Sequence, residues 1–415
     1  MRIIHTSDWH LGQNFMGKSR APEHQAFLAW LLVKIENHHV DALIVAGDIF
    51  DTGSPPSYAR EMYNRFIVDM QNSQCELVVL GGNHDSVATL NESKDLLACL
   101  NTRVVSGVSD NNEEQVFVLK NRAGEVGAIL CAIPFIRPRD VLQSQAGQSG
   151  KDKQQAMQQA ISEHYQTLYT QAVTLRDTLS QVVPIIATGH LTTVGASTSD
   201  SVREIYIGTL DAFPASAFPP ADYIALGHIH QSQLVAKSEH IRYSGSPIAL
   251  SFDETGKKKA KSVLLVEFNK GKFTQASPLE VPCFQAMQVI KGDLECIEKQ
   301  LSTLPESHDL KENEMIWLEI IVTSQDYLND LQTRLQTMTA DLPVEILLLR
   351  RERKNRQVVM PNEEKETLNE LSVGDVFERR LNEETWESED DKQRAERLML
   401  VFKQVVIELA EEEHS

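Results

Sequence analysis

Short apolar runs alternate with longer amphipathic stretches over the first third of the chain. The short runs have the length of β-strands, and the longer stretches between them repeat their apolar residues at helical spacing. The segments are, in order, residues 3–4, 22–37, 42–46, 57–72 and 77–80. Strands that alternate with helices predict a β-α-β-α-β unit whose strands are parallel.

The middle of the chain carries a different pattern, in which short apolar runs are joined by turns rich in Asn, Gly and Glu. Strands are predicted at residues 116–119, 128–133, 183–188, 222–226, 241–244 and 262–268. These runs predict a second, mixed sheet, so the protein is expected to be of the α/β class. Residues 143–182 are polar and rich in Gln, which favours a helical excursion between the sheets over a disordered linker.

The composition changes again near residues 278–282, which suggests a domain boundary. The segments that follow predict a small α+β domain, with strands at 286–290, 315–322 and 344–350 and helices at 293–303 and 325–340. A basic cluster leads from there into a tail with two predicted helices, the second at 391–411. Two helices have too small a core to fold well alone, so we expect the tail to dock on a partner. The predicted parts are residues 1–280, 281–356 and 357–415.

Composition and charge narrow the class of protein. Of the 415 residues, 41% are apolar and 24% charged, which is typical of a globular protein. There is no bilayer-length apolar run, no signal-peptide pattern and no C-x-x-C pair among the five cysteines, so we expect a soluble, cytoplasmic protein with no membrane attachment. Residues 357–415 carry 7 Lys and Arg against 17 Asp and Glu, more than half of the formal charge of −19. Taken alone, the net charge argues against broad, nonspecific attraction to phosphate backbones, but its concentration in the tail leaves residues 1–356 only mildly acidic.

Five apolar runs each end in a cluster of metal-binding side chains. The clusters contain Asp8 and His10, Asp48, Asn83, His190, and His228 and His230. In open α/β sheets the loops beyond the carboxyl ends of the strands converge in one crevice. Glycines at positions 47, 82, 189 and 227 permit tight turns close to an ion or a phosphate.

Seven ligands are too many for one ion. The economical arrangement is two ions about 3.5–4 Å apart with one bridging carboxylate, as in two-metal phosphoester hydrolysis, and Asp48 in the central loop is the natural bridge. The mixture of Asp, Asn and His suits manganese, iron or zinc better than magnesium or calcium. Taken singly, these residues are equally typical of turns, helix caps and buried histidines, but all seven together favour a metal site.

The order D-x-H, G-D-x-x-D, G-N-H-D, G-H and G-H-x-H, which spans the first 280 residues, resembles that of the calcineurin-like metallophosphoesterases. The resemblance implies a four-layer αββα sandwich with the small capping domain and the helical tail appended. It assigns one metal to Asp8, His10, Asp48 and His230, and the other to Asp48, Asn83, His190 and His228. It also implies that His84 donates a proton to the leaving oxygen or orients the phosphate, and that Asp51 pairs with His84, although several nuclease relatives carry a histidine at the position of Asp51.

The sequences of residues 3–12, 48–51 and 243–247 resemble those of the nuclease subunits of bacterial complexes that contain a coiled-coil ATPase. This resemblance extends along essentially the whole chain. The resemblance implies a manganese-dependent DNA nuclease with double-strand 3′ to 5′ exonuclease and single-strand or hairpin endonuclease activity. Such a nuclease is expected at the nucleoid in DNA end processing, repair, recombination and replication. It is also expected to form a homodimer that binds the ATPase through the C-terminal helices. No G-x-x-x-x-G-K-S/T phosphate loop occurs, so ATP dependence is expected to come from another chain.

Three questions stay open at the level of sequence. A small-molecule phosphodiesterase or a protein phosphatase would use the same two-metal site, and a non-catalytic scaffold would keep only its remnant. Lys18, Arg20, Arg137 and Arg139 are candidates for contacts with a DNA backbone. Solvated surface charge is an equally good explanation for these four.

Overall fold

The computed structural model describes residues 1–109, 111–142, 149–199, 201–202, 212–256, 260–304, 314–323 and 331–351. The chain divides into two compact units, Met1–Arg353 and Lys354–Ser415, and every described residue belongs to the first. The helical tail predicted at residues 357–415 therefore lies outside the described residues. Within the described ranges, no helix combines the length and the apolar composition that a bilayer crossing requires.

The first sheet contains the β-α-β-α-β unit predicted from the first third of the chain. Its strands, in spatial order, are β14 (Lys272–Glu280), β13 (Ser262–Asn269), β1 (Arg2–Thr6), β4 (Ala42–Val45), β5 (Glu76–Leu80) and β6 (Thr102–Val105). The last four are parallel to one another, whereas β13 pairs antiparallel with β1 and β14 pairs antiparallel with β13. Helices α1 (Ala21–Asn37) and α2 (Ser57–Met70) form the crossovers, and Pro22 stands in the first turn of α1, where its missing N–H breaks no helical bond.

The second sheet is mixed, as predicted. Its strands, in spatial order, are β11 (Gln233–Val235), β12 (Ser238–Tyr243), β10 (Tyr223–Gly227), β9 (Ile185–His190), β8 (Val126–Cys131) and β7 (Val116–Lys120). Helix α6 (Gly150–Asp177) forms most of the polar segment, which confirms the helical prediction there. Its predicted place between the two sheets is wrong, because α6 connects the parallel strands β8 and β9 of this one sheet. Shorter helices are α3 (Val87–Asn91), α4 (Lys94–Ala98) and α5 (Pro138–Val141).

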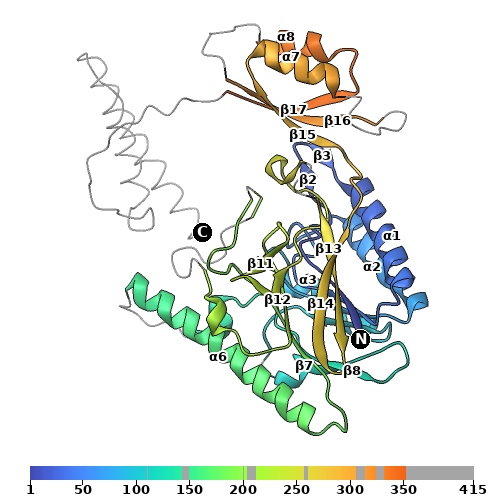
Figure 1. Cartoon of the computed structure of the whole chain (residues 1–415), viewed down its shortest axis with the longest axis vertical. Helices are drawn as coiled ribbons and strands as arrows, with labels where there is room; N and C mark the ends of the chain where they lie inside the picture. Colours follow the sequence, from blue (N-terminus) through green and yellow to red (C-terminus); the bar gives the residue numbers. More distant parts are fainter. Residues whose placement is uncertain are drawn as a thin grey trace, which may run out of the picture. The chain divides into compact units, whose positions relative to one another are not determined.

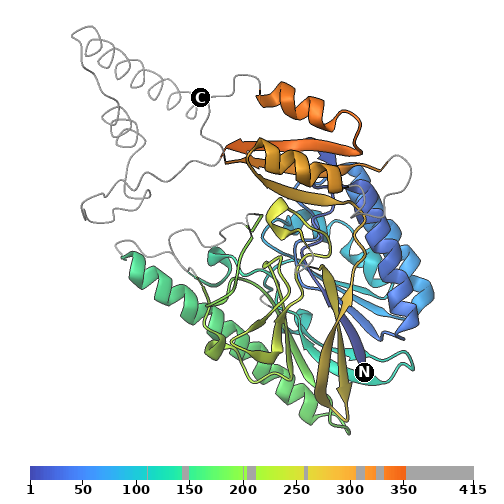
Figure 2. The same ribbon diagram turned by 45° about the horizontal axis from the view of Figure 1, so that its top comes forward.

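The two sheets pack face to face, with helices on both outer sides. On β1, Ile4 faces the core under α1 and α2, whereas Ile3 faces a core shared by both sheets. On β9, Ile186 belongs to that shared core and Ile185 to the core under α6. Figures 1 and 2 show the blue helices α1 and α2 on one side and the green α6 on the other. The alternation of strand residues thus produces the αββα order of layers that the family resemblance implied.

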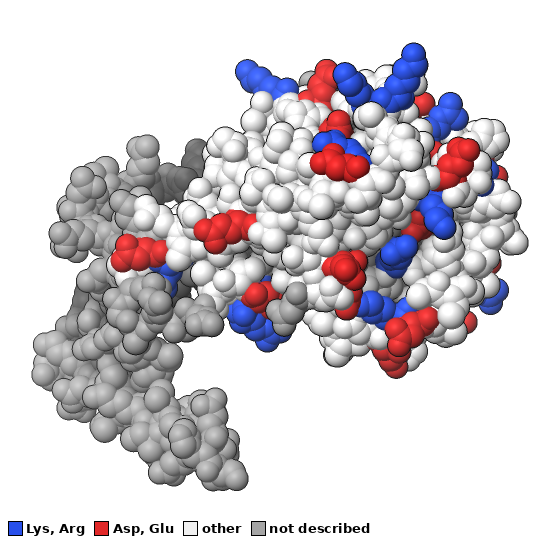
Figure 3. Space-filling view, turned by 90° about the horizontal axis from the view of Figure 1, so that it is seen from below, with Lys and Arg blue, Asp and Glu red and all other residues white. Residues whose placement is uncertain are grey.

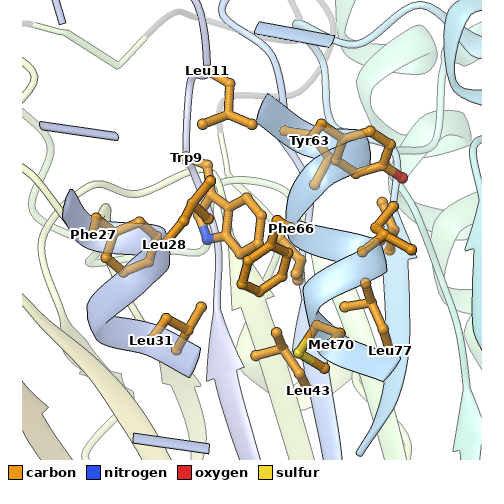
Figure 4. Packing of buried hydrophobic residues seen from close by; sticks show 14 of the residues in the cluster. Trp9, Leu11, Phe27, Leu28, Leu31, Leu43, Tyr63, Phe66, Met70 and Leu77 are labelled. Carbon is orange, nitrogen blue, oxygen red and sulfur yellow. The ribbon is translucent and has the colours of Figure 1, made fainter. Parts of the chain in front are cut away.

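Trp9 anchors the loop after β1 in the core beneath α1 and α2 (Figure 4). Its indole is completely buried and meets Phe27 of α1 and Phe66 of α2 edge to face, at ring distances of 5.8 and 5.4 Å. The indole N–H donates a hydrogen bond to Thr6 Oγ1 at 3.0 Å. A large buried aromatic with its polar atom satisfied holds a loop firmly, so the residues on either side of Trp9 have a fixed position.

The segment after β14 forms a smaller sheet with its own core. Its strands β15 (Met287–Gly292), β16 (Ile316–Val322) and β17 (Val344–Arg351) are all parallel, and helices α7 (Leu294–Thr303) and α8 (Leu331–Thr339) cover one face (Figure 1). The other face packs against the hairpin β2 (Asn14–Phe15) and β3 (Lys18–Ser19), where Trp317 stacks on Phe15 at 6.2 Å. The order of elements is the predicted one, and we call residues 287–351 the cap.

Candidate metal centre

Five loops meet at one edge of the sandwich, each at the carboxyl end of a parallel strand. β1, β4 and β5 belong to the first sheet, and β9 and β10 to the second. The predicted residues they bring together are Asp8 and His10 after β1, Asp48 after β4, Asn83 and His84 after β5, His190 at the end of β9, and His228 and His230 after β10. Side-chain ligand atoms lie within 4.8 Å of one another in three groups: Asp8, His10 and His230; His10, Asp48 and His84; and Asp8, Asp48 and His190. Residues far apart in the sequence therefore form one cluster.

Asp48 lies at the centre of the cluster. Its Oδ2 atom is 3.2 Å from His190 Nε2 and 3.6 Å from His10 Nε2. On the side of His190, the Asn83 Oδ1 atom lies 2.9 Å from His190 Nε2 and 3.2 Å from His228 Nδ1. The Asp48 carboxylate is thus within reach of both ligand sets that the sequence predicted.

Asp8 connects loops that come from different sheets. Its backbone N–H donates to Gly47 O at 3.0 Å, and its Oδ1 atom accepts from the backbone N–H of His228 at 2.9 Å. Ser7 Oγ donates to the other carboxylate oxygen at 2.5 Å. Hydrogen bonds to a charged acceptor are stronger than neutral ones, so Asp8 helps to hold the loops after β1, β4 and β10 in register.

Four of the seven predicted ligands have a left-handed backbone. They are Asp8 (φ 55°), His10 (φ 48°), Asp48 (φ 52°) and His228 (φ 92°). Each costs about 1–2 kcal/mol relative to an ordinary conformation, and such strain is typical of functional sites. Gly82 adds a close approach, because a Cβ atom there would overlap the carboxylate of Asp48.

Two buried imidazole nitrogens in the cluster lack an ordinary partner. The Nε2 atoms of His10 and His228 have no hydrogen-bond partner among the described residues, although each side chain is only 2% exposed. Buried polar atoms are nearly always satisfied, and a neutral imidazole nitrogen is a common metal ligand. Together with the carboxylates and Asn83, these nitrogens form a donor set that fits divalent manganese, iron or zinc.

The protonation of the cluster is governed by its carboxylates. Burial lowers the pKa of His190, but the Asp48 carboxylate outweighs burial and raises the pKa to about 9. Burial likewise opposes protonation of His10, but a hydrogen bond with Asp51 and the charge of Asp48 raise its pKa. In turn, burial acts to raise the pKa of Asp48, whereas the charge of His190 holds it well below its usual range. Protons on His190 and His10 thus neutralise part of the negative charge of the carboxylates, a charge that bound metal ions would otherwise balance.

His84 lies beside the cluster and contacts Asp51 through the main chain. Its Nδ1 atom lies 2.7 Å from the Asp51 carbonyl oxygen, and because a carbonyl only accepts, Nδ1 carries the proton. The Asp51 carboxylate lies 3.2 Å from His10 Nδ1. The predicted association of Asp51 with His84 is therefore found at the backbone, and the Asp51 carboxylate additionally orients a proposed ligand.

Asp85 organises two of the loops, a role not predicted from the sequence. Its carboxylate accepts hydrogen bonds from the backbone N–H groups of Gly82, Ile49 and Phe50 at 2.8, 3.1 and 3.0 Å. These bonds join the loop after β4 to the loop after β5. Asp85 is the last residue of the G-N-H-D motif, so the sequence identifies its position, but the sequence does not show the backbone groups to which it binds.

Glu254 contacts the Nδ1 atom of His230, a role that the sequence analysis also did not predict. The Nδ1 atom of His230 lies 3.2 Å from Glu254 Oε1 and 2.6 Å from Ser201 Oγ. The other carboxylate oxygen of Glu254 accepts from Lys261 Nζ at 2.6 Å and from the backbone N–H of Leu250 at 3.0 Å. Burial acts to raise the pKa of Glu254, but the Lys261 ammonium and His230 hold it well below its usual range. A carboxylate on Nδ1 leaves Nε2 of His230 available as a ligand.

Arg20 does not match the prediction of a DNA contact. Its side chain is completely buried and forms an ion pair with Glu23. Its guanidinium also lies over the rings of Phe15 and Trp317, at 5.5 and 5.6 Å. The prediction is wrong for Arg20, because the guanidinium has no access to a ligand in solution and instead supports the contact between the hairpin and the cap.

The other three predicted basic residues retain some exposure. Lys18 forms an ion pair with Glu345 of the cap at 2.6 Å. Arg137 is half-buried and donates to Asp85 O at 3.1 Å, whereas the Arg139 side chain is 80% exposed. A contact of these three residues with DNA stays a prediction.

Comparison with known proteins shows the family of the chain. A family model of the calcineurin-like phosphoesterases matches residues 1–232, more than half of the chain. The chain therefore belongs to the calcineurin-like phosphoesterase family. A second model, described as the Type 5 capsule protein repressor C-terminal domain, matches residues 283–385.

Along its whole length the chain is similar to relatives named as the D subunit of the nuclease SbcCD. It is 55% identical to that protein of Escherichia coli strain K12 over 412 residues, 99% of both chains. It is 31% identical to that of Bacillus subtilis strain 168 over 334 residues, 78% of this chain and 80% of the relative. A solved dimetal phosphatase from Danio rerio has a TM-score of 0.36 and 10% identity, covering 68% of this chain and 98% of the other. The nuclease resemblance predicted from the sequence is confirmed.

Proposed function

We propose that the chain is the nuclease subunit of an SbcCD-type complex, a metal-dependent phosphodiesterase that cleaves DNA in end processing, repair, recombination and replication. The observation that carries the proposal is the convergence of all seven predicted metal ligands in one cluster, in a chain 55% identical to a nuclease over its whole length. Double-strand 3′ to 5′ exonuclease and single-strand or hairpin endonuclease activities, at the nucleoid, are part of the proposal. Nothing in the relatives favours a small-molecule phosphodiesterase or a protein phosphatase.

Two divalent ions, manganese by preference, would be held by the predicted residues. One ion would take Asp8, His10, Asp48 and His230, and the other Asp48, Asn83, His190 and His228. The unpartnered Nε2 atoms of His10 and His228 support this division, since one belongs to each set. When bound, two such ions supply Lewis acidity at the phosphoryl group and an activated water as the nucleophile. The protein contributes the fixed positions of the ligands and a mixed donor set that suits manganese.

His84 is proposed as the group that donates a proton to the leaving oxygen or orients the phosphate. Its Nδ1–H group is held by the Asp51 carbonyl, which fixes the ring and leaves Nε2 as the atom that exchanges a proton with the substrate. The ring centroids of His84 and His10 are 4.6 Å apart, so His84 lies directly beside the ligands. Asp51 acts through both residues: its carbonyl orients His84, and its carboxylate orients His10.

The division of labour with a partner is also proposed. The name of the relatives describes one subunit of a complex, and the resemblance of the sequence implies a coiled-coil ATPase, SbcC, as the other. We propose that residues 357–415 bind this ATPase, that residues 1–280 form the nuclease domain with residues 281–356 as the capping domain, and that the chain forms a homodimer. Deleting residues 357–415 is expected to abolish co-purification with the ATPase and to leave manganese binding intact. Retained co-purification would place the docking surface elsewhere.

The experiment that tests the nuclease assignment compares wild type with Asp48→Ala. The purified full chain, alone and with its ATPase partner, is incubated with manganese and end-labelled duplex and hairpin DNA. We expect cleavage by the wild type and none by the variant, because Asp48 lies within reach of both ligand sets. Hydrolysis of a small phosphodiester that is sensitive to Asp48→Ala, without DNA cleavage, would leave the two-metal chemistry in place and refute the DNA assignment.

A further inference from the structure

The cap forms one wall of the cavity next to the metal centre. This cavity has a volume of about 370 Å³, and its lining includes His10, His84 and His230 from the centre. Its lining also includes Glu319 of β16 and Leu348 and Arg350 of β17, all from the cap. A substrate group that reaches the centre through this cavity therefore passes side chains of the cap.

The position of the cap wall is fixed by contacts close to the cavity. Trp317 of β16 stacks on Phe15 of the β2–β3 hairpin, and both rings belong to one small buried cluster with Phe252. On the same hairpin, Lys18 pairs with Glu345 of β17 at 2.6 Å. The inner face of the cap is thus held against the loops of the sandwich by aromatic and ionic contacts.

A β-bulge directs Arg350 toward this inner face. In the parallel pair of β16 and β17, Leu318 is opposite Ile346, whereas the next residue, Glu319, is opposite Leu348. One extra residue in β17 therefore shifts the alternation of its side chains. Beyond the bulge, Leu348 and Arg350 lie on the side of Glu319, and Arg351 lies opposite Val322 of the helix-covered core. Without the extra residue, Arg350 would face α7 and α8.

Carboxylates and one arginine line the cavity together with the histidines of the centre. Among the described residues that line it, the carboxylates are Asp51, Asp253 and Glu319, and Arg350 is the one Lys or Arg. Its Nε atom lies 3.1 Å from Glu319 Oε1, with the Arg350 side chain 55% exposed and that of Glu319 8% exposed. A guanidinium carries five N–H donors in a rigid fork. The contact is an ion pair without hydrogen-bond alignment, because Glu319 Oε1 has no hydrogen-bond partner among the described residues, so the pair places the fork at the cavity without using its donors.

The acidity of the chain makes the positive charge of Arg350 important for binding a polyanion. The chain has a formal charge of −19, and on the face shown in Figure 3 the Lys and Arg side chains are interspersed with Asp and Glu instead of forming a basic patch. The two divalent ions proposed for the centre would attract the scissile phosphate, whereas an adjacent phosphate near the carboxylates of Asp253 and Glu319 needs a cation of its own. Arginine suits this position because its planar fork binds phosphate oxygens in pairs.

We propose that Arg350, paired with Glu319, binds the phosphodiester group adjacent to the scissile one, so that the cap supplies a phosphate subsite to the nuclease centre. This inference rests on the proposed DNA substrate. It explains why the bulge in β17 directs Arg350 to the cavity and why a buried carboxylate accompanies it. The opposing explanation is that Arg350 serves only to neutralise Glu319, which would make the pair structural.

The test compares Arg350→Gln with Arg351→Gln in the full-length chain with manganese. The control changes the neighbouring arginine of the same strand, on the other face of the sheet. Two substrates are used: an end-labelled single-stranded oligodeoxynucleotide, which has adjacent phosphates, and bis(p-nitrophenyl) phosphate, which has one phosphodiester and no neighbour. For the oligonucleotide, kcat and KM are measured at several salt concentrations, and thermal unfolding of each variant is recorded.

The subsite predicts a selective effect of Arg350→Gln. A lost charged hydrogen bond raises KM for the oligonucleotide about tenfold or more, and one lost phosphate contact lowers the salt dependence of log kcat/KM by about 0.7. Hydrolysis of the small phosphodiester is expected to stay at the wild-type rate, and Arg351→Gln to behave as wild type on both substrates.

Two results would overturn the inference, and a third separates it from the proposed function. Unchanged KM and salt dependence, with or without a lower unfolding temperature, would make the Arg350–Glu319 pair structural. An equal loss on both substrates would place Arg350 at the scissile phosphate or in the support of the metals. If wild type hydrolyses bis(p-nitrophenyl) phosphate but not DNA, the DNA assignment itself fails, and the adjacent-phosphate subsite is refuted with it.

Discussion

Replacing Glu254 by Gln tests whether the support behind His230 tunes the metal centre. The substitution keeps the shape of the side chain and an oxygen that can accept from Lys261. It removes the negative charge that faces His230 Nδ1 at 3.2 Å. Glu254→Ala would be a poorer test, because it removes the acceptor of the Lys261 and Leu250 hydrogen bonds and the side-chain volume as well as the charge.

The expected loss is in metal affinity at one of two sites. A carboxylate on the far nitrogen of a metal-binding histidine raises the basicity of the ring and fixes its orientation, and its removal typically weakens metal binding about 10- to 100-fold. That range corresponds to about 1.4–2.7 kcal/mol. We expect the loss at the ion assigned to His230, whereas the ion assigned to His190 should be affected less.

Calorimetric titration of chelator-treated full chain with Mn²⁺ measures both affinities, and urea unfolding of the metal-free protein measures any loss of fold. The matched control is Glu267→Gln, which changes a carboxylate on β13 that pairs with Arg2 away from the centre. Unchanged Mn²⁺ affinity at both sites in Glu254→Gln would refute the reasoning. A loss of affinity that merely follows a loss of unfolding free energy would do the same.

Three further predictions follow from the site. His84→Ala should retain both metals by elemental analysis while turnover falls about 10²- to 10⁴-fold; a loss of metal would identify His84 as a ligand. In the metal-free protein the pKa of His190 is about 9, so at pH 7 manganese must displace a proton from it. Titrations in buffers of different ionisation enthalpy should therefore show proton release that diminishes, with rising affinity, as the pH increases through 9; release that does not depend on pH would contradict the assignment. Gly82→Ala should abolish metal binding, because its Cβ would overlap the Asp48 carboxylate, whereas Gly53→Ala, whose nearest neighbour would be 3.5 Å away, should retain it.

Periodicity was sufficient to predict the parallel unit and a second sheet but not all of the strands, and the αββα order of layers was implied by the family resemblance. The parallel unit follows from apolar spacing and helix α6 from the polar, Gln-rich composition of its segment, and both are present. Strand β14 was missed because it lies at the edge of the first sheet, has few buried side chains and contains Pro278. Proline is tolerated at such an edge, where a backbone N–H is not needed for pairing. Strand β6 was missed because only two of its four residues are apolar, whereas all four residues of the equally short β4 are.

Some residues of the candidate site could likewise be predicted from the sequence pattern, and others could not. The clustering of the proposed ligands could be predicted because each follows a strand, and parallel strands present their carboxyl ends at one edge. Glu254 could not, because it lies in a polar loop 24 residues beyond His230 and acts only through contacts that folding creates. Arg20 was wrongly assigned to DNA because the sequence shows a charge but not its burial.

The strained backbone at the ligands indicates where the geometry of the centre comes from. A left-handed conformation at Asp8, His10, Asp48 and His228 costs about 1–2 kcal/mol per residue, so it persists only where the surroundings impose it. Those surroundings are internal to the sandwich: Trp9 is buried between Asp8 and His10, and the backbone N–H of His10 donates to Asp48 O at 3.1 Å. The positions of the proposed ligands are therefore set by the packing of helices and sheets, and ions that bind there would meet a site that the fold has already arranged.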